Sequence, residues 1–340
     1  MLPRERFLAA LLGGKPDRTP LACVAALAPV ELQERTGCLF PEAHLDPEKL
    51  VRLSAANHEV LGFDGVSFIV NYFNEPAALG ARIDWGSPTS LPMFASHPWR
   101  RPEDAAAPGD LLERDPIRIN LRALRIAKER YGGRVGVVGK VMGPLSMVQA
   151  MHGVEETMLL FYDDPPKLLA FLDAAVGILA RSANAQFEAG IDAVLIGEGG
   201  AGAQMLSPAM YERYLFGAHR KLVAAIRGPT ILHVCGDVTP RLAALAEVGF
   251  DCFNFDWAIS PSVMKRAAAG RFSVMGNVRT SDLLRGSPEE IERQVRECLE
   301  AGVDVISPGC AVSPECPLEN FLAMGRAIAS WTEARGGAPA

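Results

Sequence analysis

The stretch GPTILHVCGDVTPRLAALAEVGFDCFNFDWAISP, residues 228–261, decides how the second half of the chain folds. Its short apolar run at 230–235 predicts a buried strand, and so does the run at 252–256. Thr239-Pro240 and Ser260-Pro261 follow these two runs, and each pair is typical of a helix start. A strand, a short loop and a capped helix, repeated without hairpin turns, indicate parallel strands joined by right-handed crossovers.

The same alternation extends outward in both directions. Ser207-Pro208 and Ser287-Pro288 open two further helices, the first of them expected to run to Arg227. Eight strand–helix units in 340 residues favour a (β/α)₈ TIM barrel, with an open doubly wound α/β sheet as the alternative. The eight strands are predicted at 20–26, 65–71, 135–141, 193–198, 230–235, 252–256, 273–278 and 303–307.

The domain organisation is predicted to be simple. No Ser/Gly linker or shift in composition divides the chain, so we expect a single barrel domain over 1–340. Residues 1–60 are expected to form an N-terminal helical extension that covers one end of the barrel. The segment 75–115, rich in Pro, Ala and Gly, is expected to build a lid or a pocket wall.

Composition excludes several classes of protein. With 49% hydrophobic and 22% charged residues the chain can bury a large core, which excludes disordered chains and small disulfide scaffolds. A net charge of −6 without a basic run argues against a nucleic-acid partner. The start, MLPRERFLAALLGG, predicts an amphipathic helix rather than a signal peptide, because Glu5 interrupts its basic residues.

Location follows from the same observations. No apolar stretch is expected to approach the roughly 20 residues of a membrane span. We therefore expect a cytoplasmic protein without membrane contact. The 7 cysteines are an odd number and are expected to be reduced thiols.

Polar or ligating side chains end most of the predicted strands. In a (β/α)₈ barrel the active site lies at these carboxyl ends, so the residues there are the candidates for chemistry. They are Glu198, His233, Cys235, Asp256, Asn277 and Cys310.

A zinc-type ligand set stands out among them. His233 and Cys235 are two residues apart on one strand and therefore point to the same face, and Cys310 follows another strand. One imidazole and two thiolates form a zinc set, and three protein ligands with an open fourth position are its catalytic form. The alternative is a buried histidine with two unrelated cysteines. Cys316 competes with Cys310 for the third position.

The loop after the strand at 193–198 formally matches G-x-G-x-x-G. Its glycines are separated from the helix start at Ser207, and Glu198 would repel a pyrophosphate, so a Rossmann site is not expected. Gly199 and Gly200 instead predict a loop that lets a bulky ligand approach the backbone, with Glu198 as a polar contact. Asp256 keeps three roles open: fourth metal ligand, partner of His233, or solvated loop acid.

The other histidines and several methionines have no clear chemical partner in the sequence. We expect surface or packing roles for four histidines and core positions for the methionines on one helix face, while a pocket-lining role stays open for His152 alone. The four histidines are His44, His58, His97 and His219, and the methionines are Met147, Met151 and Met158.

Four segments, 196–208, 228–237, 272–278 and 306–317, resemble the uroporphyrinogen decarboxylase superfamily. They are most similar to its branch of methylcobamide:coenzyme M and related corrinoid-dependent methyltransferases, and the likeness extends to 75–86 and 139–147. This resemblance implies a uroporphyrinogen decarboxylase-like (β/α)₈ barrel that binds Zn²⁺ through His233, Cys235 and Cys310. With it we expect catalytic roles for Glu198, Asp256 and Asn277, and corrinoid contacts from Glu75, Gly199 and Gly200.

The implied reaction moves a methyl group between a corrinoid (methylcobamide) on a separate corrinoid protein and a thiol such as coenzyme M. Alternatives are transfer involving tetrahydrofolate or methoxy and methylamine donors, cofactor-free decarboxylation of uroporphyrinogen, and a non-catalytic zinc barrel. Decarboxylases carry an arginine-bearing segment near the N-terminus, whereas residues 19–37 here hold no arginine before Arg35. The acceptor, the fourth zinc ligand and homodimer formation stay open.

Overall fold

The computed structural model describes residues 1–25, 27–202 and 204–336, and its centre is a barrel of eight parallel strands. Each strand pairs with the next along the chain, and a parallel bridge between Leu21 and Ile306 joins the last strand to the first. The strands are β1 (Ala22–Cys23), β2 (Gly65–Ser67), β5 (Gly136–Met142), β6 (Ala193–Gly197), β7 (Thr230–Val234), β8 (Cys252–Phe255), β9 (Ser273–Val278) and β10 (Val305–Pro308).

The prediction of eight parallel strands is confirmed, and so is the barrel rather than the open sheet. Each observed strand overlaps its predicted range, with the largest difference at β1, where only two residues form the ladder. The predicted range 20–26 also includes Ala26, which lies outside the described residues.

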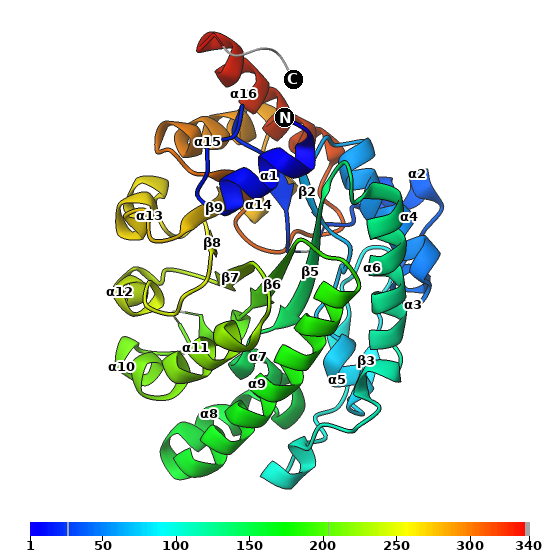
Figure 1. Cartoon of the computed structure of the whole chain (residues 1–340), viewed down its shortest axis with the longest axis vertical. Helices are drawn as coiled ribbons and strands as arrows, with labels where there is room; N and C mark the ends of the chain where they lie inside the picture. The colour runs from blue at the N-terminus through cyan, green and yellow to red at the C-terminus, as the bar shows by residue number, and fades with distance from the viewer. Residues whose placement is uncertain (26, 203, 337–340) are drawn as a thin grey trace.

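Helices surround the strands on the outside of the barrel (Figure 1). Prolines at the first positions start many of them, as at α15, where the Ser287 side chain accepts a hydrogen bond from the Glu290 amide. They are α1 (Pro3–Leu11), α2 (Val30–Thr36), α3 (Glu42–Leu45), α4 (Pro47–Glu59), α5 (Asn74–Ala78), α6 (Ile117–Tyr131), α7 (Pro144–His152), α8 (Val154–Asp163), α9 (Pro165–Glu188), α10 (Pro208–Met210), α11 (Phe216–Ala225), α12 (Leu242–Leu245), α13 (Pro261–Ala268), α14 (Thr280–Arg285), α15 (Pro288–Glu300) and α16 (Leu318–Ala334).

The helix predicted from Ser207-Pro208 is not continuous. Ser207 caps it as expected, by accepting a hydrogen bond from the Met210 amide. A π-helical segment at Tyr211–Leu215 then separates α10 from α11, and the backbone becomes extended at Ile226, one residue before the predicted end. Short π-helical insertions widen a helix locally and often occur near functional sites.

The first helix closes the amino-terminal end of the barrel. α1 contacts β2, β5, β9 and β10, and the Phe7 ring lies inside, where a Cβ on Gly65 or Gly136 would come within 2.6 or 2.4 Å of it. Both positions must therefore be glycine for this ring to fit. The expected extension 1–60 is thus only partly a cover, because β1 belongs to the barrel wall itself.

α9 corrects the expectation that no apolar stretch is long enough to span a membrane. It has 24 residues and a mean hydropathy of 1.4 over its most apolar window, so by length and composition it qualifies. However, 61% of that window is buried, and the helix packs against α7, α11 and β5. These contacts are those of a helix in the outer ring of the barrel.

The segment predicted as a lid or pocket wall contains α5, a small antiparallel pair, β3 (Ile83–Asp84) with β4 (Met93–Phe94), and two 3₁₀ turns, Pro102–Ala105 and Leu111–Glu113. It reaches the carboxyl end of the barrel through an aromatic contact, since the rings of Phe94 and Phe73 lie 4.6 Å apart between centroids. The Trp99 amide donates to the Met151 carbonyl at 2.8 Å and thereby ties the segment to α7.

Candidate metal centre and active site

A cavity of about 230 Å³ opens at the carboxyl ends of the strands. Its walls come from β5, β6 and β7, the start of α7, and the loops that follow β2, β6, β7 and β10. The lining residues are Tyr72, Phe73, Met142, Ser146, Gly197, Gly199, His233, Cys235, Cys310 and Ala311.

His233, Cys235 and Cys310 converge in this cavity. The two sulfur atoms lie 3.6 Å apart, and His233 Nε2 lies 3.3 Å from Cys235 Sγ. All three ligand atoms lie within 4.8 Å of one another, and this is the one such group of three among the described residues. The contact of His233 Nδ1 with the Asn254 carbonyl, at 3.0 Å, turns Nε2 toward the sulfurs.

The geometry and the chemistry of these donors fit zinc. Zinc with bonds of about 2.3 Å to sulfur places two sulfur ligands of a tetrahedron about 3.8 Å apart, close to the observed separation. The two cysteines are not joined as a disulfide. Cys316, the competing candidate, is buried in the hydrophobic core and is not part of the cluster. Among the described residues, no fourth His, Cys, Asp or Glu belongs to this group.

When no metal is bound, the pKa values of the three groups depend on one another. A hydrogen bond from Cys235, helped by the charge of His233, lowers the pKa of Cys310 to about 4 despite its burial. The same pairing, together with burial, raises the pKa of Cys235. Burial acts to lower the pKa of His233, but the charge of Cys310 and the hydrogen bonds to Cys310 and to the Asn254 carbonyl together outweigh it, and the net shift is upward. One sulfur is thus already a thiolate, the form that binds metals.

Glu198 lies behind the cavity wall and does not line the cavity. It is fully buried and accepts hydrogen bonds from the Leu145 amide at 3.1 Å, the Ser146 amide at 2.7 Å and the Ser146 hydroxyl at 2.6 Å. His219 Nε2 lies 3.0 Å from Oε2 of Glu198, and His219 Nδ1 lies 3.1 Å from the Tyr211 hydroxyl. The carboxylate therefore holds the start of α7 and positions Ser146, which does line the cavity.

Asp256 and Asn277 lie beside the metal ligands but not among the lining residues of the cavity. Asp256 Oδ1 accepts from the Ala258 amide at 2.9 Å and so shapes the loop after β8. The Asn277 amide donates to the carbonyls of Ile259 at 2.7 Å and Asp256 at 3.2 Å. Both residues thus fix the backbone around the site.

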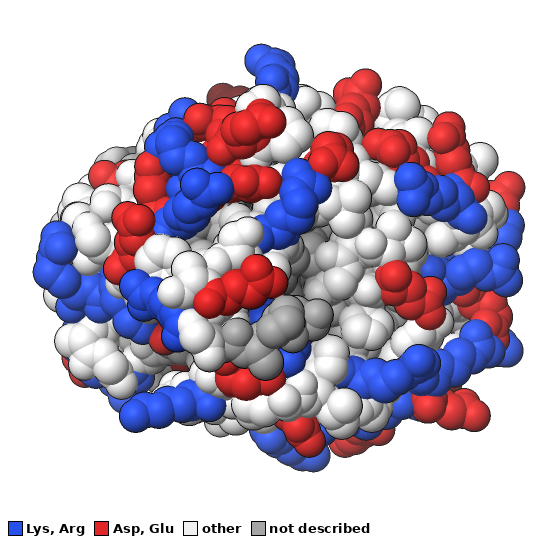
Figure 2. All heavy atoms as spheres, turned by 90° about the horizontal axis from the view of Figure 1, so that it is seen from above, with Lys and Arg blue, Asp and Glu red and all other residues white. Residues whose placement is uncertain are grey.

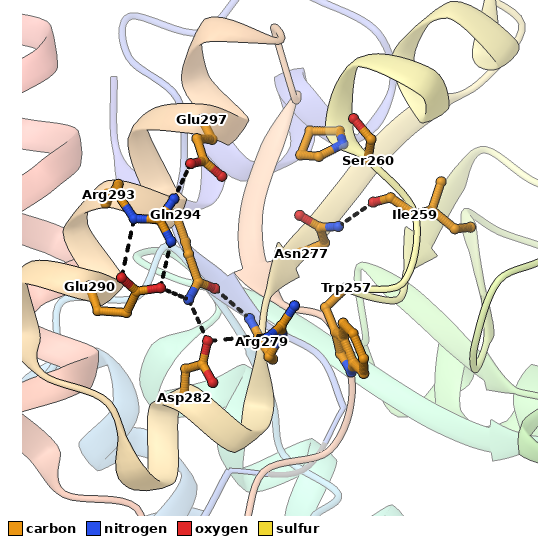
Figure 3. Close-up of a pocket in the computed structure, with 11 residues that line it drawn as sticks. Trp257, Ile259, Ser260, Asn277, Arg279, Asp282, Glu290, Arg293, Gln294 and Glu297 are labelled. Carbon is orange, nitrogen blue, oxygen red and sulfur yellow. Dashed lines mark hydrogen bonds and ion pairs between the residues drawn. The ribbon is translucent and has the colours of Figure 1, made fainter.

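Asn277 instead lines a second, polar pocket of about 280 Å³ between the loop after β8 and the helices α14 and α15 (Figure 3). There the guanidinium of Arg279 lies 4.3 Å from the centre of the Trp257 ring. Arg293 pairs with Glu290 and Glu297 on its own helix. The charges drawn in Figure 3 are therefore largely satisfied by one another.

The residues predicted to contact a corrinoid are separated in the structure. Gly199 lines the cavity, and the Gly200 amide donates to the Ser146 hydroxyl at 2.9 Å. Glu75, on α5, is 2% exposed and accepts a hydrogen bond from Ser182 at 2.5 Å. Burial raises the pKa of Glu75, as expected for a packing role away from the cavity mouth.

The structure also places other single residues considered in the sequence analysis. His152 is buried, bonds through Nδ1 to the Trp99 carbonyl at 2.9 Å and does not line the cavity. His219, expected as a surface or packing residue, has the specific partners described above. Met147 and Met151 lie in the core as expected, and Met158 packs against it.

Sequence reasoning did not single out Tyr72, Phe73 or Lys140. Lys140 on β5 is 1% exposed; its ammonium bonds to the Ala25 carbonyl and lies 4.7 Å from the centre of the Tyr72 ring. Burial lowers the pKa of Lys140 to about 7. A lysine within an otherwise apolar predicted strand was the available signal. Tyr72 and Phe73 follow β2 in a loop, where no periodicity marks their direction.

Comparisons with known proteins agree with this architecture. The family model for uroporphyrinogen decarboxylase (URO-D) matches residues 2–331. The methylated-thiol–coenzyme M methyltransferase of Methanosarcina mazei is 31% identical over 96% of this chain and 89% of its own length. The methylcobamide:CoM methyltransferase MtaA of Methanosarcina barkeri is 31% identical over 94% of this chain and 96% of its own.

A solved structure gives the same result. A methyltransferase from Methanosarcina mazei superposes with a TM-score of 0.94 at 32% identity, over 97% of this chain and 99% of that one. The resemblance seen in the sequence and the expected class of enzyme, a methyltransferase, are confirmed by these relatives. The family match spans nearly all of the chain, and the chain therefore belongs to the uroporphyrinogen decarboxylase family.

Proposed function

We propose that this protein is a zinc-dependent methyltransferase that moves a methyl group between a corrinoid and a thiol. The observation that carries the proposal is the convergence of His233, Cys235 and Cys310 on an otherwise apolar cavity at the carboxyl end of the barrel. The relatives named above support it, because two of them are named for methyl transfer to coenzyme M.

The protein's residues would hold zinc through one neutral imidazole and two thiolates. When bound, zinc supplies a Lewis acid that lowers the pKa of a substrate thiol and favours its thiolate at neutral pH. Asn254 orients His233, and Glu198 holds Ser146 and the start of α7 beside the substrate position. The aromatic wall of Tyr72 and Phe73 excludes water from the sulfur.

The bond changes balance without an added oxidant or reductant. The substrate thiol would release its proton to solvent, and the sulfur would form a bond to the methyl carbon while the cobalt–carbon bond breaks. The electron pair of the broken bond would stay with the corrinoid product. A corrinoid does not fit a cavity of about 230 Å³. It would therefore be presented across the mouth, and we propose that a separate corrinoid protein carries it.

The surroundings of the reaction are part of the proposal. All 7 cysteines are unpaired in the structure, which suits a reducing compartment, and we propose a cytoplasmic location. The face shown in Figure 2 mixes basic and acidic residues without one continuous basic field. We propose that the protein has no nucleic-acid partner.

The test is methyl transfer from methylcobalamin by the purified, zinc-loaded protein. Ethanethiol, coenzyme M, homocysteine and tetrahydrofolate are offered separately, and loss of the cobalt-bound methyl group is followed in the corrinoid spectrum. We expect a thiol to react and the rate to collapse in His233→Ala, because this removes a metal ligand. Transfer to tetrahydrofolate alone, undisturbed by zinc removal, would contradict the proposed acceptor class.

A further inference from the structure

The cavity that holds the metal ligands has walls without fixed positive charge. Apart from the three ligands, its main contacts are the rings of Tyr72 and Phe73, the thioether of Met142 and the methyl group of Ala311. None of the described residues that line it is Arg or Lys.

The charged groups nearest to the cavity do not supply a binding site for an anion. Lys140 does not line the cavity: its ammonium bonds to the Ala25 carbonyl and lies 4.7 Å from the centre of the Tyr72 ring, which forms part of the wall. On the opposite side, the Glu198 carboxylate lies directly behind Ser146, 2.6 Å from its hydroxyl. Lys140 and Glu198 thus lie behind wall residues and are bonded to protein groups, so neither offers a free cation at the cavity surface.

These surroundings restrict which thiols can bind, according to the charge that they carry. Two thiolates and a neutral imidazole already balance the charge of a divalent zinc ion, so a substrate thiolate adds one negative charge. A second anionic group on the same small molecule would lie in an apolar cavity without a partner, which is strongly unfavourable.

We propose that the acceptor thiol carries an uncharged, apolar chain of a few carbons, rather than a terminal sulfonate or carboxylate. This rests on the proposed function and specifies its substrate class. The size of the cavity, about 230 Å³, suits such a molecule. The wall is also braced, since the Phe73 ring packs on Phe94 at 4.6 Å and its amide is held by Asn71 Oδ1 at 2.9 Å.

Binding of three thiols with the same two-carbon core tests the proposal without requiring turnover. Ethanethiol, 2-mercaptoethanesulfonate and 3-mercaptopropionate are titrated into the full-length zinc-loaded protein by calorimetry. We expect ethanethiol to bind at least about ten-fold more tightly than either anionic thiol. Equal or tighter binding of an anionic thiol, or no binding of ethanethiol, would overturn the proposal.

A pair of variants tests whether the charge of the cavity wall determines which thiol binds. Phe73→Arg introduces a cation beside the cavity, and Phe73→Leu removes the ring without adding charge. We expect Phe73→Arg to shift the binding ratio toward 2-mercaptoethanesulfonate by about ten-fold or more, and Phe73→Leu to leave it unchanged. An equal shift in both variants would show that charge is not the cause.

Methyl transfer from methylcobalamin to the same thiols separates this inference from the proposed function. If the protein binds ethanethiol selectively but methylates no thiol, the substrate preference stands and the proposed function fails. If it methylates 2-mercaptoethanesulfonate faster than ethanethiol, the proposed function stands and the preference fails.

Discussion

At the scale of single residues, the metal centre depends on which cysteine follows β10. Cys310, in the loop after β10, lies 3.6 Å from Cys235, which follows β7, and both residues line the cavity. Cys316 is 2% exposed and packs in the core, and burial raises its pKa to about 11. Cys310 therefore differs from Cys316 in position, because only Cys310 belongs to the group of three ligand atoms.

This difference predicts the zinc content of two matched variants. Cys310→Ser should reduce bound zinc from about one equivalent per chain to a small fraction, because three protein ligands hold the ion. Cys316→Ser, the control, should keep its zinc. Metal analysis after dialysis measures both, and loss of zinc in Cys316→Ser alone would assign the third ligand to Cys316.

Lys140 is a second residue whose burial has a measurable consequence. Burial favours its neutral form and lowers its pKa from an ordinary 10.5 to about 7. Its neighbours do not titrate over the same interval, since burial raises the pKa of Cys23 to about 12 and that of Tyr72 well above 10.0. Between these limits the unfolded chain binds a proton that the folded chain does not.

The free energy of unfolding should therefore rise with pH between about 7 and 10.5 by as much as about 1.4 kcal/mol per pH unit from this group. Lys140→Met should remove that component and stabilise the protein most at the lower end of the interval. Urea unfolding of both proteins at several pH values gives the difference. A difference that does not change with pH would contradict a neutral buried lysine.

At the scale of elements, strands were more predictable than what joins them. β9 is observed at its predicted bounds, because an apolar run between clear turn and cap signals leaves little choice of register. The helix from Ser207 is divided by a π-helical segment that carries Tyr211, whose hydroxyl meets His219 inside the barrel wall. That contact depends on packing against Glu198, which the local sequence does not encode.

The packing of α1 into the end of the barrel predicts how substitutions on α1 and β5 combine. Gly136→Ala on β5 would place a methyl group 2.4 Å from the Phe7 ring, and overpacking of this kind typically costs about 1–3 kcal/mol. Phe7→Leu relieves the clash at the expense of buried surface. The cost of the double variant should therefore be less than the sum of the two single costs, as measured by urea unfolding. Additive costs would show that the ring and β5 are not in contact.

At the scale of the whole molecule, the architecture was predictable from the sequence. Which strand-end residues enter the cavity and which bond to the surrounding backbone was not. The polar residues at the strand ends identified the metal ligands, which the structure brings together. Glu198, Asp256 and Asn277 share that position along the chain, yet they bond to backbone groups around the cavity. Whether a strand-end side chain faces the cavity or the neighbouring loop depends on contacts between distant segments.

The whole molecule also predicts which family reaction is absent. We expect no decarboxylation of uroporphyrinogen, whose eight carboxylates need many cations, because the described cavity lining holds no Arg or Lys. Arg35, the first arginine of residues 19–37, lies exposed on α2. Incubation with uroporphyrinogen and chromatography of the products tests this, and formation of coproporphyrinogen would contradict it.

The bridge between Leu21 and Ile306 sets an order in time as well as in space. The Ile306 amide donates to the Pro20 carbonyl at 2.9 Å, so the first strand of the wall obtains its second neighbour only after almost the entire sequence has left the ribosome. Until then β1 has an unpaired edge, and Cys310 has not yet joined His233 and Cys235. Ring closure and completion of the metal-binding set thus belong to the same late moment of synthesis, and a growing chain cannot acquire one long before the other.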